Sequence, residues 1–374
     1  MRHPRGLTPD PATAEIYERR ADDYERLRPP RHQARAAALL ARALPDRLVL
    51  DVGCGPGSYT ADLGADTIAL DLSAAMLRRA RDAGALRLLR SDLTAPPFRH
   101  RSLGGAWSRH SHLHVPKADL PVALARLHWA LEVGAPLTMS LWRGDGDGDG
   151  DGDGEGIVGP AEDADLPGRF FARWQPDDAH TVVAGAGFDV DEVSVEGESV
   201  WIHARRARTL ADTVGPGMRV LVCGLNPSLV SADAGFGFAG ATNRFWRAAV
   251  ESGVVSRPKD PLAALRVDGA GMTDLVKRAT AAAAELTRGE YRAGADRVRN
   301  LVGWLRPRLV LFVGLAGWRA AIDRRARPGL QGEPFAGVPA YVMPSTSGFN
   351  AATPLADLVA HMKAACVIAG PLTP

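Results

Sequence analysis

Two turns in the 374-residue chain follow buried strand patterns and carry residue types that bind or activate ligands. In LVLDVGCGPGSYTADL the strand pattern ends at Asp51, and Gly53, Gly55 and Gly57 follow at alternate positions. In RVLVCGLNPSLV the strand pattern leads to the carboxamide of Asn226. Open α/β sheets bind their ligands at the carboxyl ends of the strands, so each turn is a candidate site.

The first turn is suited to a nucleotide-like ligand. Glycines let the backbone approach a ligand closely, and the amides of the helix that we expect from about Ser58 favour an anionic or polar group. The next strand pattern ends at Asp71, where an acid accepts hydrogen bonds from both hydroxyls of a ribose. Asp92 ends the strand pattern after that and could border an adenine. A dinucleotide fingerprint would require glycine in place of Ser58.

This D-x-G-x-G-x-G turn, with acids at two successive strand ends, resembles the class I S-adenosylmethionine-dependent methyltransferases. The resemblance covers residues 12–206, from the lead-in helix IYERRADDYERLRPP to a closing antiparallel hairpin. It implies S-adenosyl-L-methionine as the cofactor. The residues that would cradle its methionine part are Asp51, Gly53, Gly55 and Gly57, with Asp71 on the ribose and Asp92 near the adenine. An NAD-type or ligandless Rossmann domain is the alternative.

The methyl acceptor is not specified by the sequence. Methyl transfer needs a nucleophile aligned with the sulfonium methyl, and positioning can suffice without a dedicated base. The stretch SRHSHLHVP places His110, His112 and His114 where members of the resembled family often line the acceptor pocket. A metal site, pocket lining and ordinary packing are the three alternatives. No clustered carboxylate or cysteine accompanies these histidines, so we predict no metal site.

The second turn, which carries Asn226, is followed by residue types that differ from those of the first site. Phe238 follows in a loop between small residues, and a later strand pattern ends in PSTSGFN. There Ser345, Ser347 and Gly348 form a tight turn that offers hydroxyls and amides to phosphates, and Phe349 is an apolar wedge. Together with the carboxamide, these features suit the flipping of a base out of a duplex. Taken singly, they could instead be a turn former, a core aromatic and loop serines.

Together these residues resemble the mismatch-specific uracil/thymine DNA glycosylases of the uracil-DNA glycosylase superfamily. The resemblance runs over residues 218–365 and rests on GLNPSLVSADAGFGFAGATNRFW, GMTDLVKRAT, RLVLFVG and MPSTSGF. It implies that Asn226 orients the attacking water, Phe238 stacks on the flipped base and Phe349 fills the gap in the stack. The implied partner is double-stranded DNA with mispaired uracil or thymine.

Two departures from the family pattern bear on the chemistry. Ser228 stands where relatives carry a second glycine, and its hydroxymethyl group could crowd the sugar or gain a contact. Position 226 carries Asn and not the Asp of the fast uracil enzymes, so no general base is evident and slow turnover is expected. Phe349 in the wedge position leaves the preference for the opposite base open.

The elements that carry these sites predict two α/β domains. We expect a Rossmann-like methyltransferase sheet with a closing antiparallel hairpin over 1–207, a linker over 208–217 and a glycosylase-like parallel sheet flanked by helices over 218–374. The repeat GDGDGDGDGDGEG (144–156) is expected to be a disordered loop inside the first domain, with a calcium site as the weaker alternative.

Composition narrows the functional classes. The three cysteines are far apart, so the chain has neither a disulfide framework nor a zinc motif, and no stretch is apolar enough for a membrane span. We expect a cytoplasmic protein. Residues 216–374 hold 19 Lys and Arg against 11 Asp and Glu, which suits a polyanionic partner or a solvated surface.

The whole chain is thus predicted to be a bifunctional fusion. The alternatives are a small-molecule methyltransferase whose second domain binds DNA without catalysis, and a first domain that only binds its cofactor.

Overall fold

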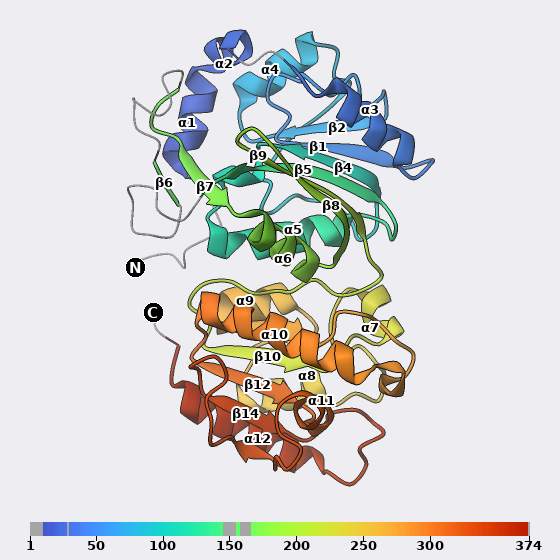
Figure 1. Cartoon of the computed structure of the whole chain (residues 1–374), viewed down its shortest axis with the longest axis vertical. Coiled ribbons are helices and arrows are strands. Elements are labelled where there is room, and N and C mark those ends of the chain that lie inside the picture. Colours follow the sequence, from blue (N-terminus) through green and yellow to red (C-terminus); the bar gives the residue numbers. More distant parts are fainter. Residues whose placement is uncertain (1–9, 28–29, 145–154, 158–165, 373–374) are drawn as a thin grey trace. The chain divides into compact units, whose positions relative to one another are not determined.

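The computed structural model describes residues 10–27, 30–144, 155–157 and 166–372, and the chain forms two compact units, Met1–Ala207 and Arg208–Pro374 (Figure 1). Most of the glycine-aspartate repeat, residues 145–154, lies outside the described residues. The structure therefore does not test our expectation that this segment is a disordered loop. No helix among the described residues is long and apolar enough to span a membrane.

The first unit is built on a nine-stranded sheet. Seven strands follow the order β3-β2-β1-β4-β5-β7-β6, and β9 pairs antiparallel with β5 and with β8. This is the Rossmann-like sheet with a closing hairpin that the sequence predicts. The strands are β1 (Leu48–Val52), β2 (Thr67–Asp71), β3 (Arg87–Arg90), β4 (Leu103–Arg109), β5 (Pro136–Arg143), β6 (Glu155–Ile157), β7 (Phe170–Trp174), β8 (Phe188–Glu196) and β9 (Ser199–Arg206).

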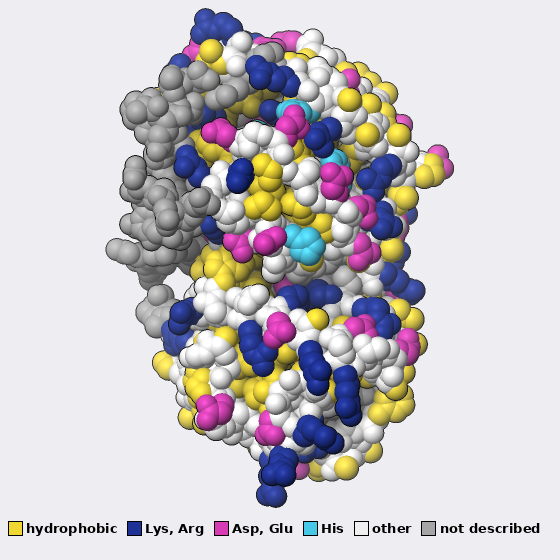
Figure 2. Space-filling view, in the orientation of Figure 1, with side chains coloured by type: hydrophobic (Ala, Val, Ile, Leu, Met, Phe, Trp, Pro, Cys, Tyr) yellow, Lys and Arg dark blue, Asp and Glu magenta, His cyan; other side chains and the backbone are white. Residues whose placement is uncertain are grey.

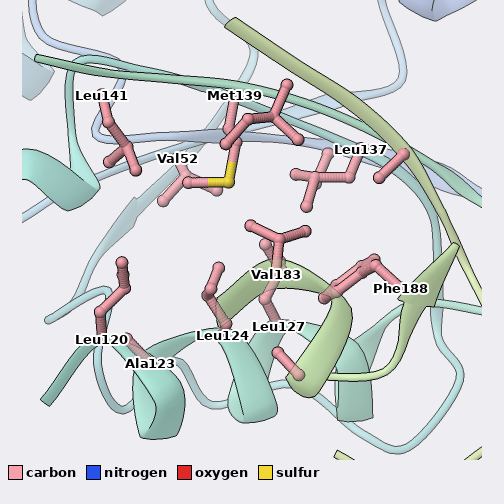
Figure 3. Close-up of a cluster of buried hydrophobic side chains, with 14 of the residues drawn as sticks. Val52, Leu120, Ala123, Leu124, Leu127, Leu137, Met139, Leu141, Val183 and Phe188 are labelled. Carbon is pink, nitrogen blue, oxygen red and sulfur yellow. The ribbon is translucent and has the colours of Figure 1, made fainter. Parts of the chain in front are cut away.

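Helices cover both faces of this sheet because successive strand residues point to opposite sides. In β1, Val52 belongs to the core under α5 and α6 (Figure 3), and so does Leu50. Val49 instead packs with the α3 residue Leu39. The helices of this unit are α1 (Pro11–Arg19), α2 (Ala21–Leu27), α3 (Gln33–Arg42), α4 (Ala74–Asp82), α5 (Leu120–Ala130) and α6 (Pro176–Gly185), with short 3₁₀ turns η1 (His112–His114) and η2 (Lys117–Asp119).

Our prediction of a helix that begins at about Ser58 is wrong. Residues 53–63 form a series of turns, in which the Thr60 amide donates to the Gly57 carbonyl at 3.1 Å. Positive φ angles of 83° at Gly57 and 86° at Gly64 bracket the segment. Since only six residues remain between these two glycines, the segment is too short for a stable helix.

The second unit has a five-stranded sheet in the order β11-β10-β12-β14-β13, parallel except for β13. Strands β10 and β12 are buried along their whole length, as a parallel sheet covered on both faces requires. The strands are β10 (Val220–Gly224), β11 (Ala270–Asp274), β12 (Leu309–Val313), β13 (Gly329–Leu330) and β14 (Ala340–Met343). The helices are α7 (Leu229–Ala234), α8 (Phe245–Ser252), α9 (Pro261–Asp268), α10 (Arg288–Leu305), α11 (Leu315–Ala321) and α12 (Leu355–Ala369), with a 3₁₀ turn η3 (Ala283–Glu285).

The parallel register brings the carboxyl ends of the strands to one edge. Gly224 at the end of β10 pairs with Asp274 at the end of β11, and Val313 at the end of β12 pairs with Met343 at the end of β14. The turn with Asn226 and the PSTSGF segment leave the sheet at this edge. The fold therefore gathers both halves of the predicted glycosylase site at one place.

The segment 208–217, which we expected to be a linker, is built into the second unit. Thr213 forms an antiparallel bridge with Met272. Asp212 is buried, and its carboxylate oxygens lie 2.9 Å from Lys277 Nζ and 2.6 Å from Arg297 Nη1. A buried carboxylate needs such partners, so the sequence around it must fold with the strand and helix that supply them.

Candidate functional sites

A pocket of about 720 Å³, partly open to solvent, lies at the carboxyl ends of β1, β2 and β4 in the first unit. Gly53, Gly55 and Asp71 line it. Gly53 and Gly55 have φ angles of 62° and 55°, which side chains disfavour. The Asp71 carboxylate accepts from the amides of Gly55 and Ser73 at 2.9 Å each, and burial raises its pKa.

The other three predicted cofactor residues are not among those that line the pocket. Asp51 is buried and accepts from the Thr60 hydroxyl at 2.8 Å, and burial raises its pKa to about 7. A Cβ on Gly57 would lie 2.9 Å from the backbone of Ala80 in α4, so this glycine permits close packing. Asp92 accepts from the amide and the hydroxyl of Thr94 at 2.7 and 2.8 Å. These residues shape the loops that form the pocket.

Two of the three histidines of SRHSHLHVP line the pocket, and the third, His112, does not. His112 is buried and lies 2.6 Å from the Ser108 hydroxyl, and burial lowers its pKa to about 4. His110 and His114 line the pocket. His110 Nε2 lies 2.9 Å from the Ser199 hydroxyl. No group of His, Cys, Asp and Glu among the described residues is arranged to hold a metal ion.

A polar chain that the sequence did not reveal closes this pocket from α1. His114 Nδ1 donates to the Phe170 carbonyl at 2.8 Å, so its Nε2 accepts from the Tyr17 hydroxyl at 2.8 Å. Arg169 donates to the same hydroxyl at 2.8 Å. Burial lowers the pKa of His114 to about 4 and raises that of Tyr17. In the sequence, only the motif of the lead-in helix indicated that this region belongs to the site. The hydrogen bonds of Tyr17 with His114 and Arg169 join segments that lie far apart in the sequence.

The pocket fits S-adenosylmethionine. Met76 and Leu93 offer apolar wall, and each Asp71 oxygen retains a further lone pair for a ribose hydroxyl. A neutral His114 and a hydrogen-bonded Tyr17 line the same pocket.

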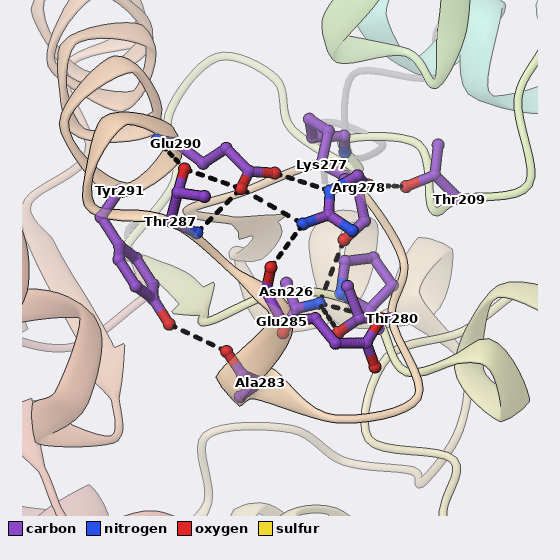
Figure 4. A network of polar contacts seen from close by, with 11 residues as sticks. Thr209, Asn226, Lys277, Arg278, Thr280, Ala283, Glu285, Thr287, Glu290 and Tyr291 are labelled. Atoms are coloured by element: carbon purple, nitrogen blue, oxygen red, sulfur yellow. Dashed lines mark hydrogen bonds and ion pairs between the residues drawn. The ribbon is translucent and has the colours of Figure 1, made fainter.

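In the second unit the carboxamide of Asn226 is fixed by its nitrogen (Figure 4). Nδ2 donates to the Thr280 hydroxyl at 2.8 Å, to the Arg278 carbonyl at 3.0 Å and to the Pro227 carbonyl at 3.1 Å. No described residue donates to its Oδ1. The side chain is therefore oriented by three acceptors and presents a free carbonyl oxygen.

The support for Asn226 extends to the start of α10 (Figure 4). Arg278 Nε donates to Glu290 Oε1 at 2.6 Å, and the guanidinium also donates to the Glu285 carbonyl at 2.9 Å. Glu290 forms the capping box of α10 with Thr287. The hydrogen bond from Arg278, together with those from Thr287, lowers the pKa of Glu290 to about 2. The backbone carbonyl that holds Asn226 is thus anchored by an ion pair and a helix cap. Sequence reasoning missed Thr280, Arg278 and Glu290.

Phe238 stands in an unusual backbone conformation, with φ at 59°. Its ring stacks on Phe245 with centroids 3.9 Å apart and 17° between the ring planes. The residue is half-buried and lines a cavity of about 350 Å³. A positive φ in a residue with a large side chain is uncommon and is often found at ligand sites.

Ser228, the departure from the family pattern, gains a contact. Its hydroxyl oxygen accepts from the Ser231 amide at 3.1 Å and caps α7. The same hydroxyl lies 3.0 Å from Ser231 Oγ, which accepts from the Ala239 amide at 3.2 Å. The serine therefore supports the loop that carries Phe238.

The PSTSGF segment is held from behind by Arg244 of the NRFW motif. This guanidinium donates to the backbone carbonyls of Ser347, Asn350 and Thr353 at 3.3, 2.7 and 2.6 Å. The amide of Ser347 donates to Ser345 Oγ at 3.2 Å. Gly348 has no room for a Cβ, which would overlap the Thr242 side chain.

The predicted wedge is fully in solvent. The Phe349 side chain is 101% exposed, against 81% for Val367, the next most exposed large hydrophobic residue. Single exposed apolar side chains are common on protein surfaces, so the exposure alone assigns no role to Phe349.

Two family models match the chain. Residues 49–134 match a model described as a methyltransferase domain, and residues 211–365 match that of the uracil DNA glycosylase superfamily. Both families are those that the motifs indicate. The cofactor of the methyltransferase domain is S-adenosyl-L-methionine.

Solved structures with a similar fold include three methyltransferases. They are an S-adenosylmethionine-dependent methyltransferase from Methanosarcina mazei (13% identity, 46% of this chain and 97% of that chain, TM-score 0.40), one from Mesorhizobium loti (22%, 45% and 96%, 0.36) and the CcbJ methyltransferase from Streptomyces caelestis (16%, 53% and 99%, 0.42).

Proposed function

We propose, on the premise that the chain joins a methyltransferase domain to a domain of the uracil DNA glycosylase superfamily, that the second unit hydrolyses the N-glycosidic bond of uracil mispaired with guanine in DNA. The observation that carries the proposal is the carboxamide of Asn226. Its nitrogen is held by three acceptors, so its carbonyl oxygen is available to orient a water molecule.

The reaction that these residues support is dissociative. The C1′–N1 bond of the flipped nucleotide breaks first, and the electron pair leaves with the base. The water held by Asn226 then adds to C1′ of the oxocarbenium ion, and its proton passes to solvent. Because a carboxamide takes no proton, bond cleavage depends on stabilising the departing base, and turnover is slow.

The remaining groups bind and deform the DNA. The serine turn offers hydroxyls and amides to phosphates, and Phe349 takes the place of the extruded base. Figure 2 shows Lys and Arg side chains gathered on the viewed face of the second unit. Exposed arginines of α10, α11 and the segments that follow them are Arg288, Arg292, Arg306, Arg319, Arg324, Arg325 and Arg327. Such a surface favours a polyanion.

A labelled G·U duplex tests the proposal. The full chain is incubated with the duplex, and alkali then reveals abasic sites. We expect excision of uracil from G·U, with thymine from G·T slower or absent. N226A should lower the single-turnover rate by at least about 100-fold and leave DNA binding unchanged, since the side chain orients water and grips no phosphate. The exposed N300A is the matched control. An N226A variant as fast as the parent chain would refute the assigned chemistry.

We further propose that the first unit transfers a methyl group to an acceptor in the same pocket. When bound, the cofactor supplies an electrophilic methyl on a sulfonium. Gly53, Gly55 and Asp71 would hold it, and Tyr17 and His114 would border the acceptor. Incubation of the full chain with a cell extract and methyl-labelled cofactor tests this. Cofactor binding without any labelled product would favour a binding module.

A further inference from the structure

One arginine in the pocket of the first unit has no role in the reactions described above. Arg109 ends β4 and lines the pocket of about 720 Å³. Its Nε is buried, and no described residue accepts a hydrogen bond from its guanidinium. Among the described residues, the guanidinium contacts the ring of Tyr59, with Cζ 5.5 Å from the ring centroid. A guanidinium is always charged and carries five N–H donors, so one without protein acceptors at a pocket is available to an anion.

The other charged groups at this pocket are already bonded. Asp71 is the one acid among the described residues that line it, and its oxygens accept from two backbone amides at 2.9 Å each. Arg169 lies behind the wall and donates to the Tyr17 hydroxyl at 2.8 Å and to the Leu166 carbonyl at 2.9 Å. Arg109 is therefore the cation that the described pocket wall leaves for a ligand.

The strand registers place Arg109 and Asp71 on opposite sides of the glycine turn. Each stands two residues beyond the strand residue that pairs with Asp51 of β1, so both are level with Gly53. Adjacent strands lie about 4.8 Å apart, so the two side chains attach about 10 Å from each other, with β1 between them. A cofactor whose ribose is held by Asp71 lies over the turn, and Arg109 stands on its far side, next to β5.

The backbone after Arg109 is strained and anchored. His110 has a φ of 52°, which a residue with a side chain rarely adopts. Its amide donates to the Ser140 carbonyl of β5 at 3.2 Å, and its Nε2 lies 2.9 Å from the Ser199 hydroxyl of β9. Residues in such conformations cluster at ligand sites. The end of β4 therefore has the features of a built site.

We propose that Arg109 binds a carboxylate or phosphate group of the methyl acceptor, so that the first unit methylates small anionic molecules. This inference rests on the methyl transfer proposed above and names the class of its acceptor. The planar fork of a guanidinium pairs with two oxygens of a carboxylate or phosphate.

The charge balance of the loaded pocket favours such an acceptor. S-adenosylmethionine carries one net positive charge, because its ammonium and sulfonium groups outnumber its carboxylate. Together with Arg109, it leaves the pocket positive even when Asp71 is ionised. An anionic acceptor offsets this surplus, which is costly in a site shielded from water.

The carboxylate of the cofactor is the competing partner for Arg109. The affinities of the full chain for S-adenosylmethionine and for 5′-methylthioadenosine, which lacks that carboxylate, separate the two partners. We expect R109Q to bind both within about twofold of the parent chain, since no hydrogen bond to either is lost. Loss of S-adenosylmethionine affinity with unchanged 5′-methylthioadenosine affinity would assign Arg109 to the cofactor and overturn the proposal.

The acceptor class is tested on the small-molecule fraction of a cell extract, separated by anion exchange at pH 7 into a retained and an unretained pool. The full chain and methyl-labelled cofactor are added to each pool. We expect labelled product from the retained pool. R109Q should raise the KM for this acceptor at least about tenfold, because hydrogen bonds to a charged group are lost.

Two further variants make the result specific. R109K keeps the charge without the fork, so its KM should lie between those of the parent chain and R109Q. R99Q removes an exposed arginine outside the pocket and should match the parent chain. Labelled product from the unretained pool alone would overturn the proposal, and so would an equal KM in R109Q and the parent chain.

A binding readout separates this inference from methyl transfer itself. Formate, benzoate and inorganic phosphate are titrated by calorimetry into the full chain saturated with S-adenosylhomocysteine, with benzamide as the neutral control. Binding of at least one anion but not of benzamide, lost in R109Q, supports the anion site even if no labelled product forms. Absence of anion binding, or anion binding that R109Q retains, overturns it.

Discussion

The side-chain nitrogen of Asn226, Nδ2, lies 2.8 Å from the hydroxyl oxygen of Thr280, a residue 54 positions further along the chain. The orientation of the proposed catalytic carboxamide is thus set by the loop after β11 and not by its own turn alone.

Removing this hydroxyl should impair excision without unfolding the domain. In T280V the carboxamide loses one of three acceptors, and a hydrogen bond of this kind contributes about 1 kcal/mol. We expect a fall of about fivefold in the single-turnover rate with unchanged DNA affinity. T181V, which removes an exposed hydroxyl in α6, should have no effect. Equal rates for the parent and T280V would show that the contact is not used.

Cofactor binding should depend on Asp71. D71A removes the acceptor for the ribose hydroxyls and also frees the amides of Gly55 and Ser73. We expect S-adenosylmethionine affinity, measured by calorimetry, to fall by about 1–3 kcal/mol. D66A removes an exposed acid before the same strand and is the control. Binding of NADH in place of S-adenosylmethionine would contradict the assignment.

Phe349 should matter for DNA and not for the fold. Its side chain buries nothing, so F349A should unfold at the same temperature as the parent chain. Aromatic stacking on bases contributes about 1–3 kcal/mol, so the affinity for a G·U duplex should fall by that amount. V367A, another exposed apolar residue, should leave both quantities unchanged. Unaltered affinity in F349A would exclude it as the wedge.

The buried charge cluster should make the second unit sensitive to acid. Burial would raise the pKa of Asp212, but Arg297 and Lys277 together lower it below the ordinary value. A folded-state pKa below the unfolded one stabilises the fold above the unfolded pKa, and this contribution is lost as pH falls through the folded pKa.

D212A tests that cluster by denaturant unfolding of the full chain. It leaves Lys277 and Arg297 without their partner, and breaking a buried pair costs about 3–5 kcal/mol. We expect the loss to be large at pH 7 and to shrink in acid. D357A, at an exposed position in α12, is the control. A constant difference across pH would contradict a role for the Asp212 charge.

Motifs with a fixed spacing predicted much of this structure. Each strand-plus-turn unit, around Gly53 and around Asn226, stands where the sequence places it, because a buried apolar run followed by glycine or Asn-Pro has few alternative conformations. The closing hairpin was likewise readable from alternation in β8 and β9.

Contacts between segments that lie far apart in the chain could not be predicted from the sequence. Tyr17 meets His114, and Asp212 meets Lys277 and Arg297, only because the folded chain brings them together. The segment 208–217, which we expected to be a linker, lies in the second unit because the buried carboxylate of Asp212 within it has partners on distant segments.

The backbone of Phe238 has a consequence for the domain that carries it. A phenylalanine at positive φ costs about 1–3 kcal/mol, which is comparable to the 0.5–1.5 kcal/mol that its stacking on Phe245 returns. The ring also packs against the hydrophobic core of the second unit, and this packing offsets part of the strain. A glycine at this position would release the strain and lose both contacts, so the conformation of this loop and the core of the domain depend on the same side chain.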